Sequence, residues 1–204
     1  MIQSFDNFES ASREALSYLR NIIPFDLWMM TRVDGDSWIV LQTEDHGYDI
    51  AEGTVIQWAD SFCSRMVQGF GPIIAPNANS VQAYASAPIA QQVSIGAYVG
   101  VPIIYDDGSL FGTLCGIDPE LKSDELLDKQ PLVEMLSSLL STILNNDLRV
   151  LELQRTMETI QYQAQTDPLT GLMNRRGWNE TLAKEEICAR RYGSPVCILS
   201  LIHI

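Results

Sequence analysis

The sequence predicts an α+β fold built on a mainly antiparallel sheet, followed by a long helix and the start of a second α/β domain. Two pairs of strand-like segments, each joined by a turn with an Asp-Gly step, predict β-hairpins within residues 1–120. Helical segments separate the hairpins without strict strand–helix alternation, which favours an antiparallel sheet. From Asp124 to Thr166 the chain has no glycine and a single proline, which indicates a long helix.

The first 120 residues contain six segments with distinct local signals. Apolar side chains at helical spacing mark the helices, and β-rich runs that flank the turns mark the hairpins. In chain order the segments are a helix at 5–22, a hairpin at 25–45, a helix at 57–69, a short strand at 72–76, an irregular segment at 77–94 and a hairpin at 95–118.

The charge of the chain is strongly acidic and uneven. The 204 residues carry 26 acidic and 13 basic side chains, and residues 1–120 hold 15 of the acids and only 4 of the bases. Because such a surface repels phosphate groups, we expect no binding of nucleic acid or of membrane surfaces. There is no apolar run of about 18 residues and no signal-peptide pattern, so we expect a cytoplasmic protein.

Four cysteines lie far apart in the chain, at Cys63, Cys115, Cys188 and Cys197, without any Cys-x-x-Cys pair. With only two histidines present, this spacing does not predict a zinc site. We interpret the four as reduced, mostly buried thiols that act as small hydrophobic groups. A thiol-based redox sensor at Cys63 is the alternative.

Residues 121–165 are predicted to form a coiled-coil helix that joins two copies of the chain. Apolar residues recur in alternating steps of four and three, the period of a coiled-coil seam. Asn146 is the one polar member, and an asparagine in a seam fixes the register of the paired helices. The alternative is a single helix that lies on the first domain, for which a broader apolar face is expected. The predicted seam comprises Leu132, Leu136, Leu139, Ile143, Asn146, Val150, Leu153, Met157 and Ile160.

Residues 166–204 have the pattern of a helix that stops and restarts. Pro168 disfavours a helical conformation at Asp167, and Gly171 permits a turn. Asn174 is a good N-cap for a new helix, which Gly193 closes. The last residues, 196–204, predict a buried strand. Composition alone therefore indicates only that a second α/β domain begins here.

The segment TDPLTGLMNRR around this turn resembles the opening signature of GGDEF domains, the catalytic domains of diguanylate cyclases. The resemblance implies that residues 166–204 are the truncated start of such a domain and that the turn is its junction with the helix. Asp167 and Arg175 bracket the turn and are candidates for an ion pair. The matching residues are Asp167, Leu169, Thr170, Gly171, Leu172, Asn174, Arg175 and Arg176.

Residues 1–120 resemble GAF sensor domains, above all in the segment GAYVGVPIIYDDGSLFGTLCGID. A PAS domain is the alternative for the same segment. The GAF resemblance implies a central antiparallel sheet flanked by helices, with an unknown small ligand between the sheet and segment 77–94. The candidate pocket residues are Trp28, Trp58, Phe62, Asn77, Asn79, Tyr84 and Tyr98.

Together the two resemblances imply the sensory part of a diguanylate cyclase, a homodimer that condenses two GTP into cyclic di-GMP with Mg²⁺. In that family, carboxylates on the first strand of the GGDEF domain hold the metal, whereas Ile202 and Ile204 occupy the aligned positions here. We therefore expect no catalytic residue, metal site or cofactor in these 204 residues, and Mg²⁺ and GTP in a complete protein. The alternatives are a non-catalytic sensor or effector module with a degenerate GGDEF half, and a purely dimerising interaction protein.

Overall fold

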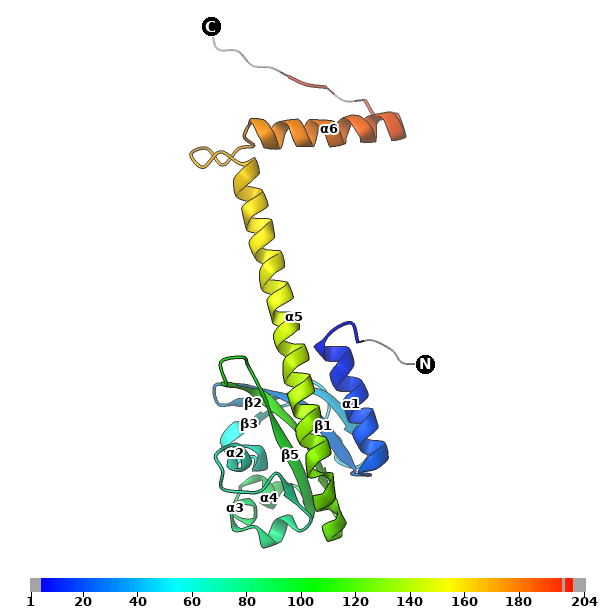
Figure 1. The fold of residues 1–204 in the computed structure, drawn as a ribbon, viewed down its shortest axis with the longest axis vertical. Coiled ribbons are helices and arrows are strands. Elements are labelled where there is room, and N and C mark those ends of the chain that lie inside the picture. Colours follow the sequence, from blue (N-terminus) through cyan, green and yellow to red (C-terminus); the bar gives the residue numbers. More distant parts are fainter. Residues whose placement is uncertain (1–4, 196, 200–204) are drawn as a thin grey trace. The chain divides into compact units, whose positions relative to one another are not determined.

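The structure is a computed structural model that describes residues 5–195 and 197–199. The chain divides into two compact units, the first reaching Leu148 and the second beginning at Arg149. The boundary falls inside one uninterrupted helix, α5, which has 36 residues from Gln130 to Gln165 (Figure 1). None of the helices in the described ranges is both long and apolar enough to cross a bilayer.

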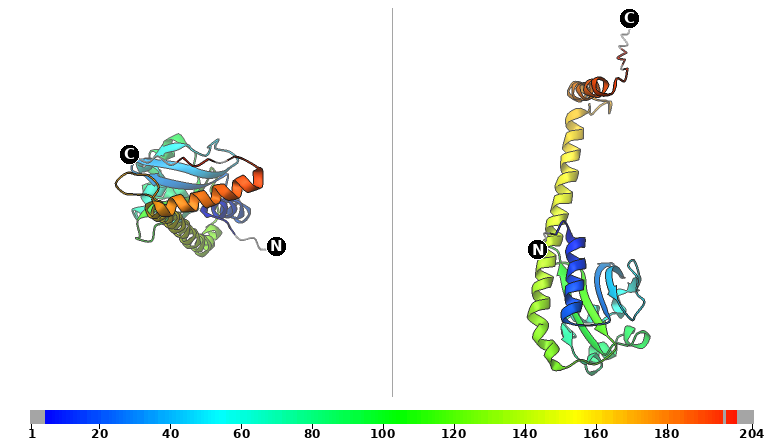
Figure 2. Two further views of the ribbon diagram at one scale, coloured as in Figure 1. Left: turned by 90° about the horizontal axis from the view of Figure 1, so that it is seen from above. Right: turned by 90° about the vertical axis from the view of Figure 1, so that its right-hand side faces the viewer.

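A six-stranded antiparallel sheet forms the centre of the first unit (Figures 1 and 2). The strands lie side by side in the order β3-β2-β1-β6-β5-β4. This arrangement confirms both predicted hairpins, the short strand at 72–76 and the α+β class. The strands are β1 (Leu27–Asp34), β2 (Ser37–Asp45), β3 (Val55–Gln57), β4 (Ile74–Ala75), β5 (Ala97–Ile104) and β6 (Leu110–Asp118).

Glycine residues form the turns of the two hairpins. Gly35, between β1 and β2, has φ +59°, and Gly108, between β5 and β6, has φ +82°. Residues other than glycine rarely adopt this left-handed backbone conformation. The conformation matches the twist of the flanking strands. The hairpins join into one sheet because β1 also pairs with β6, from Leu27 opposite Ile117 to Arg32 opposite Gly112.

Helices cover both faces of the sheet. Helix α1 (Phe8–Ile22) and the first half of α5 share one apolar core with residues of one sheet face. The other face packs against a second core that includes α2 (Phe62–Val67) and α3 (Gln82–Ala85), with α4 (Ile89–Gln92) at its edge. Segment 77–94, expected to be irregular, therefore contains two short helices and the 3₁₀ turn Ala78–Ser80.

Helix α1 begins where the sequence supplies a capping box. The Asn7 side chain accepts a hydrogen bond from the backbone N–H of Ser10, and the Ser10 hydroxyl accepts one from the N–H of Asn7. These bonds satisfy N–H groups that have no partner within the helix. The face that packs on the sheet presents Ala11, Leu16 and Leu19, all nearly or fully buried.

The first half of α5 docks on the sheet through apolar side chains and a row of polar ones. Strand β4 pairs with Tyr98 and Val99, and the Gly100 N–H donates to the Ile73 carbonyl at 2.8 Å. Beyond Gly100 the outer edge of β5 has no strand partner in the described part of the chain. Ser141 Oγ accepts a hydrogen bond from the Ile104 N–H at 3.1 Å. Asn145 donates to the Ile104 carbonyl and accepts from the N–H of Asp106, both at 3.1 Å.

These polar side chains are spaced four residues apart on α5, so they form one row on the helix. Ser137, one turn earlier, donates to the Pro102 carbonyl of the same strand. The row covers strand edge that would otherwise be open to pairing with another chain. The buried apolar side chains beside it are Val133, Leu140 and Leu144.

Within the first unit, the predicted seam of α5 is partly covered by the sheet domain and partly exposed. Leu136 and Ile143 are half-buried against the first core, whereas Leu139 is 52% exposed. Leu132 is also half-buried, and Asn146 is exposed. The helix thus lies on the first domain, as the alternative interpretation expected, and still presents an exposed apolar row. That row continues through Val150, Leu153, Met157 and Ile160, all more than half exposed.

The second unit consists of the remainder of α5, a turn and helix α6 (Arg175–Tyr192). The predicted N-cap is confirmed, because Asn174 accepts a hydrogen bond from the Gly177 N–H at 2.9 Å. Gly193, with φ +68°, ends α6 as predicted. The predicted terminal strand is wrong for residues 197–199, which are exposed and in no strand, and its other residues, Ile202 and Ile204 included, lie outside the described ranges. A buried strand needs neighbours, and the described part of this unit contains no sheet to supply them.

Two adjacent asparagines test the docking of α5. Asn145→Ala leaves the Ile104 carbonyl and the Asp106 N–H without their α5 partner, so we expect the free energy of unfolding to fall by about 1–3 kcal/mol. Asn146→Ala, at an exposed position, should change it by less than about 0.5 kcal/mol. Urea unfolding of each variant measures the difference, and equal effects would contradict the docking argument.

Candidate functional site

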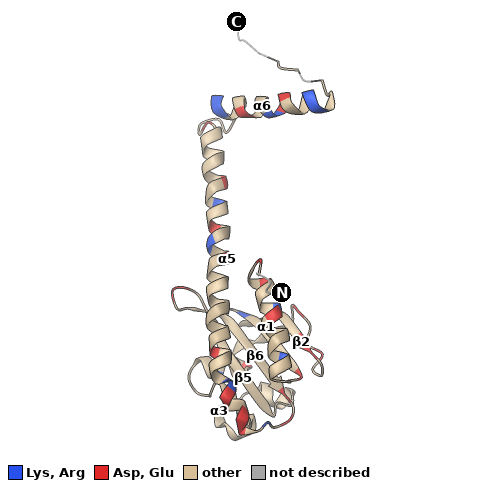
Figure 3. Ribbon diagram, turned by 45° about the vertical axis from the view of Figure 1, so that its right-hand side comes forward, with Lys and Arg blue, Asp and Glu red and all other residues tan. Residues whose placement is uncertain are grey.

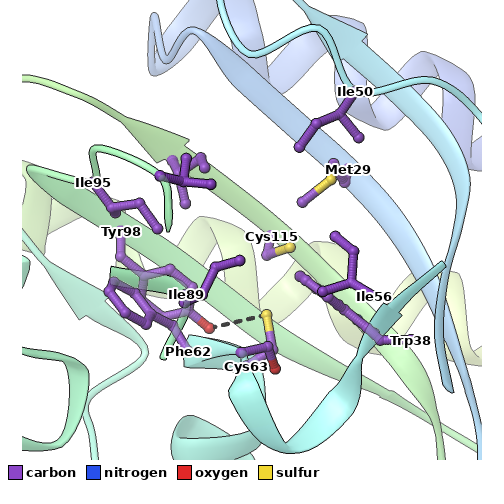
Figure 4. Close-up of a pocket in the computed structure, with 13 residues that line it drawn as sticks. Met29, Trp38, Ile50, Ile56, Phe62, Cys63, Ile89, Ile95, Tyr98 and Cys115 are labelled. Atoms are coloured by element: carbon purple, nitrogen blue, oxygen red, sulfur yellow. Dashed lines mark hydrogen bonds between the residues drawn. The ribbon is translucent and has the colours of Figure 1, made fainter. Parts of the chain in front are cut away.

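A small cavity lies on the sheet face that carries α2 and α4 (Figure 4). Its volume is about 30 Å³, and about 10–15 Å³ of such space is enough to hold one water molecule. Side chains from both halves of the sheet meet helices and loops around it. The lining residues are Met29, Trp38, Ile50, Ile56, Ser61, Phe62, Cys63, Ile89, Val93, Ile95, Tyr98, Cys115 and Ile117.

Gly116 in β6 shows which side chains of this strand face the cavity. Gly116 lies against the indole of Trp28, where an added Cβ would come within 2.7 Å of the ring. Trp28 belongs to the core under α1 and α5. Because successive strand residues point to opposite faces, Cys115 points the other way, toward the cavity. The same alternation in β5 directs Tyr98 toward the cavity and Val99 toward the helices.

Three aromatic rings form one wall of the cavity and its backing. The ring of Phe62 stacks on Tyr84 with centroids 4.8 Å apart and meets Tyr98 edge-on at 5.6 Å. Tyr84 donates a hydrogen bond from its hydroxyl to the Pro72 carbonyl. An added Cβ at Gly71 would come within 2.5 Å of the Tyr84 ring, so glycine there permits this packing. Tyr84 therefore supports the wall from behind and does not line the cavity.

A hydrogen-bonded network of buried side chains lies beside the cavity. The Trp38 indole N–H donates to Thr31 Oγ1 at 2.7 Å, and Thr31 Oγ1 lies 2.8 Å from Thr113 Oγ1. The Tyr98 hydroxyl donates to Cys63 Sγ at 3.3 Å, the interaction drawn as a dashed line in Figure 4. All five side chains are almost completely buried.

The two cavity thiols have opposite pKa shifts. Burial opposes ionisation of Cys63, but hydrogen bonds from Cys115, Thr113 and Tyr98 outweigh it and lower the pKa of this thiol. The hydrogen bond to Cys63, together with burial, raises the pKa of Cys115 well above its ordinary value. Burial also raises the pKa of the Tyr98 phenol, and the neighbouring thiols add to this shift. At neutral pH both Tyr98 and Cys115 are therefore protonated and can act as hydrogen-bond donors to Cys63.

The loop at 46–50, which contributes Ile50 to the cavity, is organised by one carboxylate. Asp45 accepts hydrogen bonds from the backbone N–H groups of Gly47 at 2.9 Å, Tyr48 at 2.8 Å and Ile50 at 2.5 Å. Partial burial raises the pKa of Asp45, and the three hydrogen bonds overcome this effect, so its pKa lies below the ordinary value.

The pKa of Asp45 gives a pH-dependent test of this loop. A carboxyl with a lowered pKa in the folded state stabilises it at higher pH, and the stabilisation is lost as the pH falls through the folded-state pKa. Asp45→Asn should therefore be less stable than the wild type at neutral pH, since its amide NH₂ would face the Ile50 N–H. The difference in free energy of unfolding should shrink below about pH 4, near the reference pKa of aspartate. Urea unfolding across the pH range measures it, and a constant difference would contradict the argument.

The seven pocket candidates from the sequence occupy three kinds of place. Phe62 and Tyr98 line the cavity, and Tyr84 backs it. Trp58 packs on Trp38, with ring centroids 6.2 Å apart, outside the lining set. The other three lie elsewhere: Asn77 and Asn79 are exposed, Asn77 capping a 3₁₀ turn, and Trp28 lies on the opposite face with its indole N–H bonded to the Ile23 carbonyl.

The sequence interpretation did not place Cys115, Met29 and Trp38 in the site. The signal for Cys115 is its position between Leu114 and Gly116 in β6, but the glycine indicates a face only once the position of its neighbour Trp28 is known. The expectation of mostly buried cysteines is confirmed for Cys63 and Cys115 and is wrong for Cys188 and Cys197, which are exposed.

The junction motif of the second unit forms a tight turn closed by Asp167. Its carboxylate accepts hydrogen bonds from the Thr170 N–H at 2.9 Å, the Thr170 hydroxyl at 2.8 Å and the Leu169 N–H at 3.2 Å. Gly171 takes φ +70°, as expected for the turn. Leu172 and Leu169 are exposed.

The expected ion pair between Asp167 and Arg175 is not found within the described ranges. The Asp167 carboxylate is instead bonded to its own turn. Arg176 pairs with Glu180 one turn along α6, at 3.0 Å. Asn174 connects the two helices, since its side chain donates to the carbonyls of Ala164 and Thr166.

No group of three or more His, Cys, Asp or Glu side chains in the described residues is placed to hold a metal ion. The polar groups that line the cavity include the thiols of Cys63 and Cys115 and the hydroxyls of Ser61 and Tyr98.

Comparison with known proteins matches residues 7–144 to the GAF domain. The chain is 25% identical over 197 residues to the diguanylate cyclase DgcP of Escherichia coli, covering 94% of this chain and 56% of that protein.

Solved structures share the fold. The GAF domain of an Acinetobacter phosphoenolpyruvate-protein phosphotransferase has a TM-score of 0.57 at 14% identity, covering 72% of this chain and 87% of that one. The PixJ GAF domain of Thermosynechococcus elongatus has a TM-score of 0.56 at 19% identity, covering 76% of this chain and 93% of that one.

The family match extends beyond the predicted boundary at residue 120 and includes the part of α5 that docks on the sheet. The match also decides between GAF and PAS domains, the two families considered for residues 1–120, in favour of GAF. The chain belongs to the GAF domain family.

Proposed function

We propose that this chain is the sensory and dimerising part of a diguanylate cyclase, in which the GAF domain controls formation of cyclic di-GMP from GTP. The observation that carries the proposal is the similarity to the E. coli diguanylate cyclase, which covers 94% of this chain although the GAF match ends at residue 144. The chain spans about half of that relative's length, at 56%. The activity is accordingly proposed for a protein that also has a complete catalytic domain, with GTP and Mg²⁺ bound there.

The geometry of the second unit supports this assignment. The motif around Asp167 resembles the start of a GGDEF domain, and its turn is held by hydrogen bonds within the motif. Asn174 ties the end of α5 to the start of α6 through both its cap and its bonds to α5 carbonyls. A turn that is bonded at both ends is suited to transmit a movement of α5 to the domain that follows.

The exposed row on α5 supports a homodimer. Two GTP molecules must meet between two catalytic domains, so a cyclase of this kind needs paired chains. Leu139, Val150, Leu153, Met157 and Ile160 are each more than half exposed and follow the period of a coiled-coil seam. Burying these side chains against a second copy removes apolar surface from water, which favours association.

The charge of the first unit argues against a nucleic-acid or membrane partner. Asp and Glu far outnumber Lys and Arg in residues 1–120, and Figure 3 shows few basic residues on the first unit. An acidic surface repels phosphate groups. We propose instead a small molecule as the signal, and the cavity of about 30 Å³ favours one much smaller than a nucleotide.

Paired substitutions of exposed leucines test the dimer. Leu139→Glu with Leu153→Glu places charges in the seam, and we expect the chain to become monomeric in sedimentation at micromolar concentration. Leu148→Glu with Leu151→Glu is the matched control, because both leucines are exposed on α5 but lie off the seam. A monomeric wild-type chain, or equal effects of the two pairs, would contradict the coiled coil.

Cyclic di-GMP formation tests the function. The 204 residues alone should form none, and residues 1–201 fused to a complete GGDEF catalytic half, with aspartate at position 202, should form it from GTP and Mg²⁺. In that fusion Leu139→Glu with Leu153→Glu should lower the rate by about 10²-fold, since the two sites lose their enforced proximity. Chromatography of the nucleotides measures product. The control pair Leu148→Glu with Leu151→Glu should retain activity. A folded, dimeric fusion without product would overturn the proposal in favour of the degenerate effector module.

A further inference from the structure

Two thiols from separate elements meet at the cavity of the first unit. Cys63 lies on α2 and Cys115 on β6, and each is 1% exposed. Both line the cavity, as does Tyr98, whose hydroxyl is bonded to Cys63 (Figure 4). We propose that they are a reactive thiol pair, in which Cys63 attacks a small hydroperoxide such as hydrogen peroxide and Cys115 then closes a disulfide with it. This inference rests on the proposed sensory role of the cavity for the biological purpose of the thiol pair. Its test measures the thiols themselves and does not depend on that role.

The dimensions of the cavity select the substrate class. A volume of about 30 Å³ accepts a molecule of roughly the size of water, and hydrogen peroxide is only slightly larger. The wall is made mainly of apolar side chains, such as Met29, Ile56 and Ile95. Such a wall excludes ions and bulky polar molecules, whereas a small neutral oxidant pays little desolvation cost to enter.

The hydrogen bonds around the cavity are directed at Cys63. The Trp38 indole N–H can only donate, so Thr31 Oγ1 accepts a hydrogen bond from it, and the Thr31 hydroxyl donates to the Thr113 carbonyl at 2.9 Å. The Thr113 hydroxyl lies beside both cavity thiols and can donate to Cys63, to which Tyr98 donates at 3.3 Å. A sulfur that receives several hydrogen bonds is stabilised as the thiolate, the nucleophilic form of cysteine.

The Tyr98 hydroxyl, which donates to Cys63 Sγ at 3.3 Å, and the opposite pKa shifts of the two thiols together assign their roles. The pKa of Cys63 is lowered, since its hydrogen bonds outweigh burial, and that of Cys115 is raised, first by its hydrogen bond to Cys63. Cys63 is therefore the attacking sulfur. Cys115 remains protonated until Cys63 has reacted, and it is placed to resolve the product.

The reaction balances with the peroxide as the only oxidant. The Cys63 thiolate attacks one peroxide oxygen, so an S–O bond forms, the O–O bond breaks and the leaving hydroxide takes a proton to become water. Cys63 is then a sulfenic acid. The Cys115 sulfur attacks Cys63 Sγ, the S–S bond forms, the S–O bond breaks, and hydroxide leaves with the Cys115 proton as a second water. Two thiols are oxidised by two electrons and one peroxide is reduced.

The test uses the full chain with the exposed thiols removed by Cys188→Ser and Cys197→Ser. Hydrogen peroxide should link Cys63 to Cys115 in the folded protein, seen by mass spectrometry of non-reduced peptides. With Cys115→Ser added, removal of the excess peroxide followed by unfolding in the presence of a 1,3-dione reagent should trap the sulfenic acid that formed at Cys63 in the folded protein. With Cys63→Ser added, Cys115 should remain a free thiol. A cross-link that forms only in denaturant, or sulfenic acid at Cys115, would overturn the proposal.

Two tyrosines provide a matched pair of positioning variants. Tyr98→Phe removes a donor to Cys63, so oxidation at neutral pH should slow by about tenfold, the effect of one pKa unit, and the midpoint of the rate–pH profile should move to higher pH. Tyr84→Phe removes a hydroxyl bonded to the Pro72 carbonyl and should leave the oxidation rate and the midpoint of its pH profile unchanged. Equal rates and midpoints in the two variants would contradict the hydrogen-bond argument. Because the readout is the thiol state, loss of dimerisation or of cyclic di-GMP formation leaves this test intact.

Discussion

The docking of α5 on the outer edge of β5 is the constraint on which the rest of this molecule depends. Strand β4 covers only the Tyr98–Val99 end of that edge. Beyond Gly100, whose N–H is bonded to the Ile73 carbonyl, the outward backbone groups would be open to another strand. Ser137, Ser141 and Asn145 of the helix bond to them instead. This row fixes the rotation of α5 about its own axis, and the rotation in turn decides which side chains remain exposed for a second chain.

Strand β5 connects the cavity to this helix. Tyr98, near one end of the strand, lines the cavity and bonds to Cys63. Ile104, at the other end, holds hydrogen bonds with Ser141 and Asn145 of α5. Between them Val99, Val101 and Ile103 are buried in the core shared with α1 and α5. A chemical change beside Tyr98 therefore acts on the strand whose opposite face and end hold the output helix.

Much of the fold could be predicted from the sequence, and much less of the site, for a physical reason. The Asp-Gly turns predict the hairpins, and the apolar residues in steps of four and three predict the seam. Strands β1, β5 and β6 are buried on both faces, so apolar residues do not alternate with polar ones and the sequence does not reveal which residues share a face. The sequence alone therefore does not exclude Trp28 from the pocket, whereas in the structure Gly116 leaves room for its indole in the core under α1 and α5.

Helix α5 shows how two requirements fit into one sequence. A helix turns by about 100° per residue, so adjacent residues face different directions. Asn145 and Asn146 are neighbours, yet Asn145 is 9% exposed and bonded to β5, whereas Asn146 is exposed in the seam row. Docking requires polar groups where a strand edge is open, and pairing requires apolar groups on another side. Beyond Leu148 the docking requirement ends with the first unit, and only the seam pattern and the solubility of the other sides constrain the sequence.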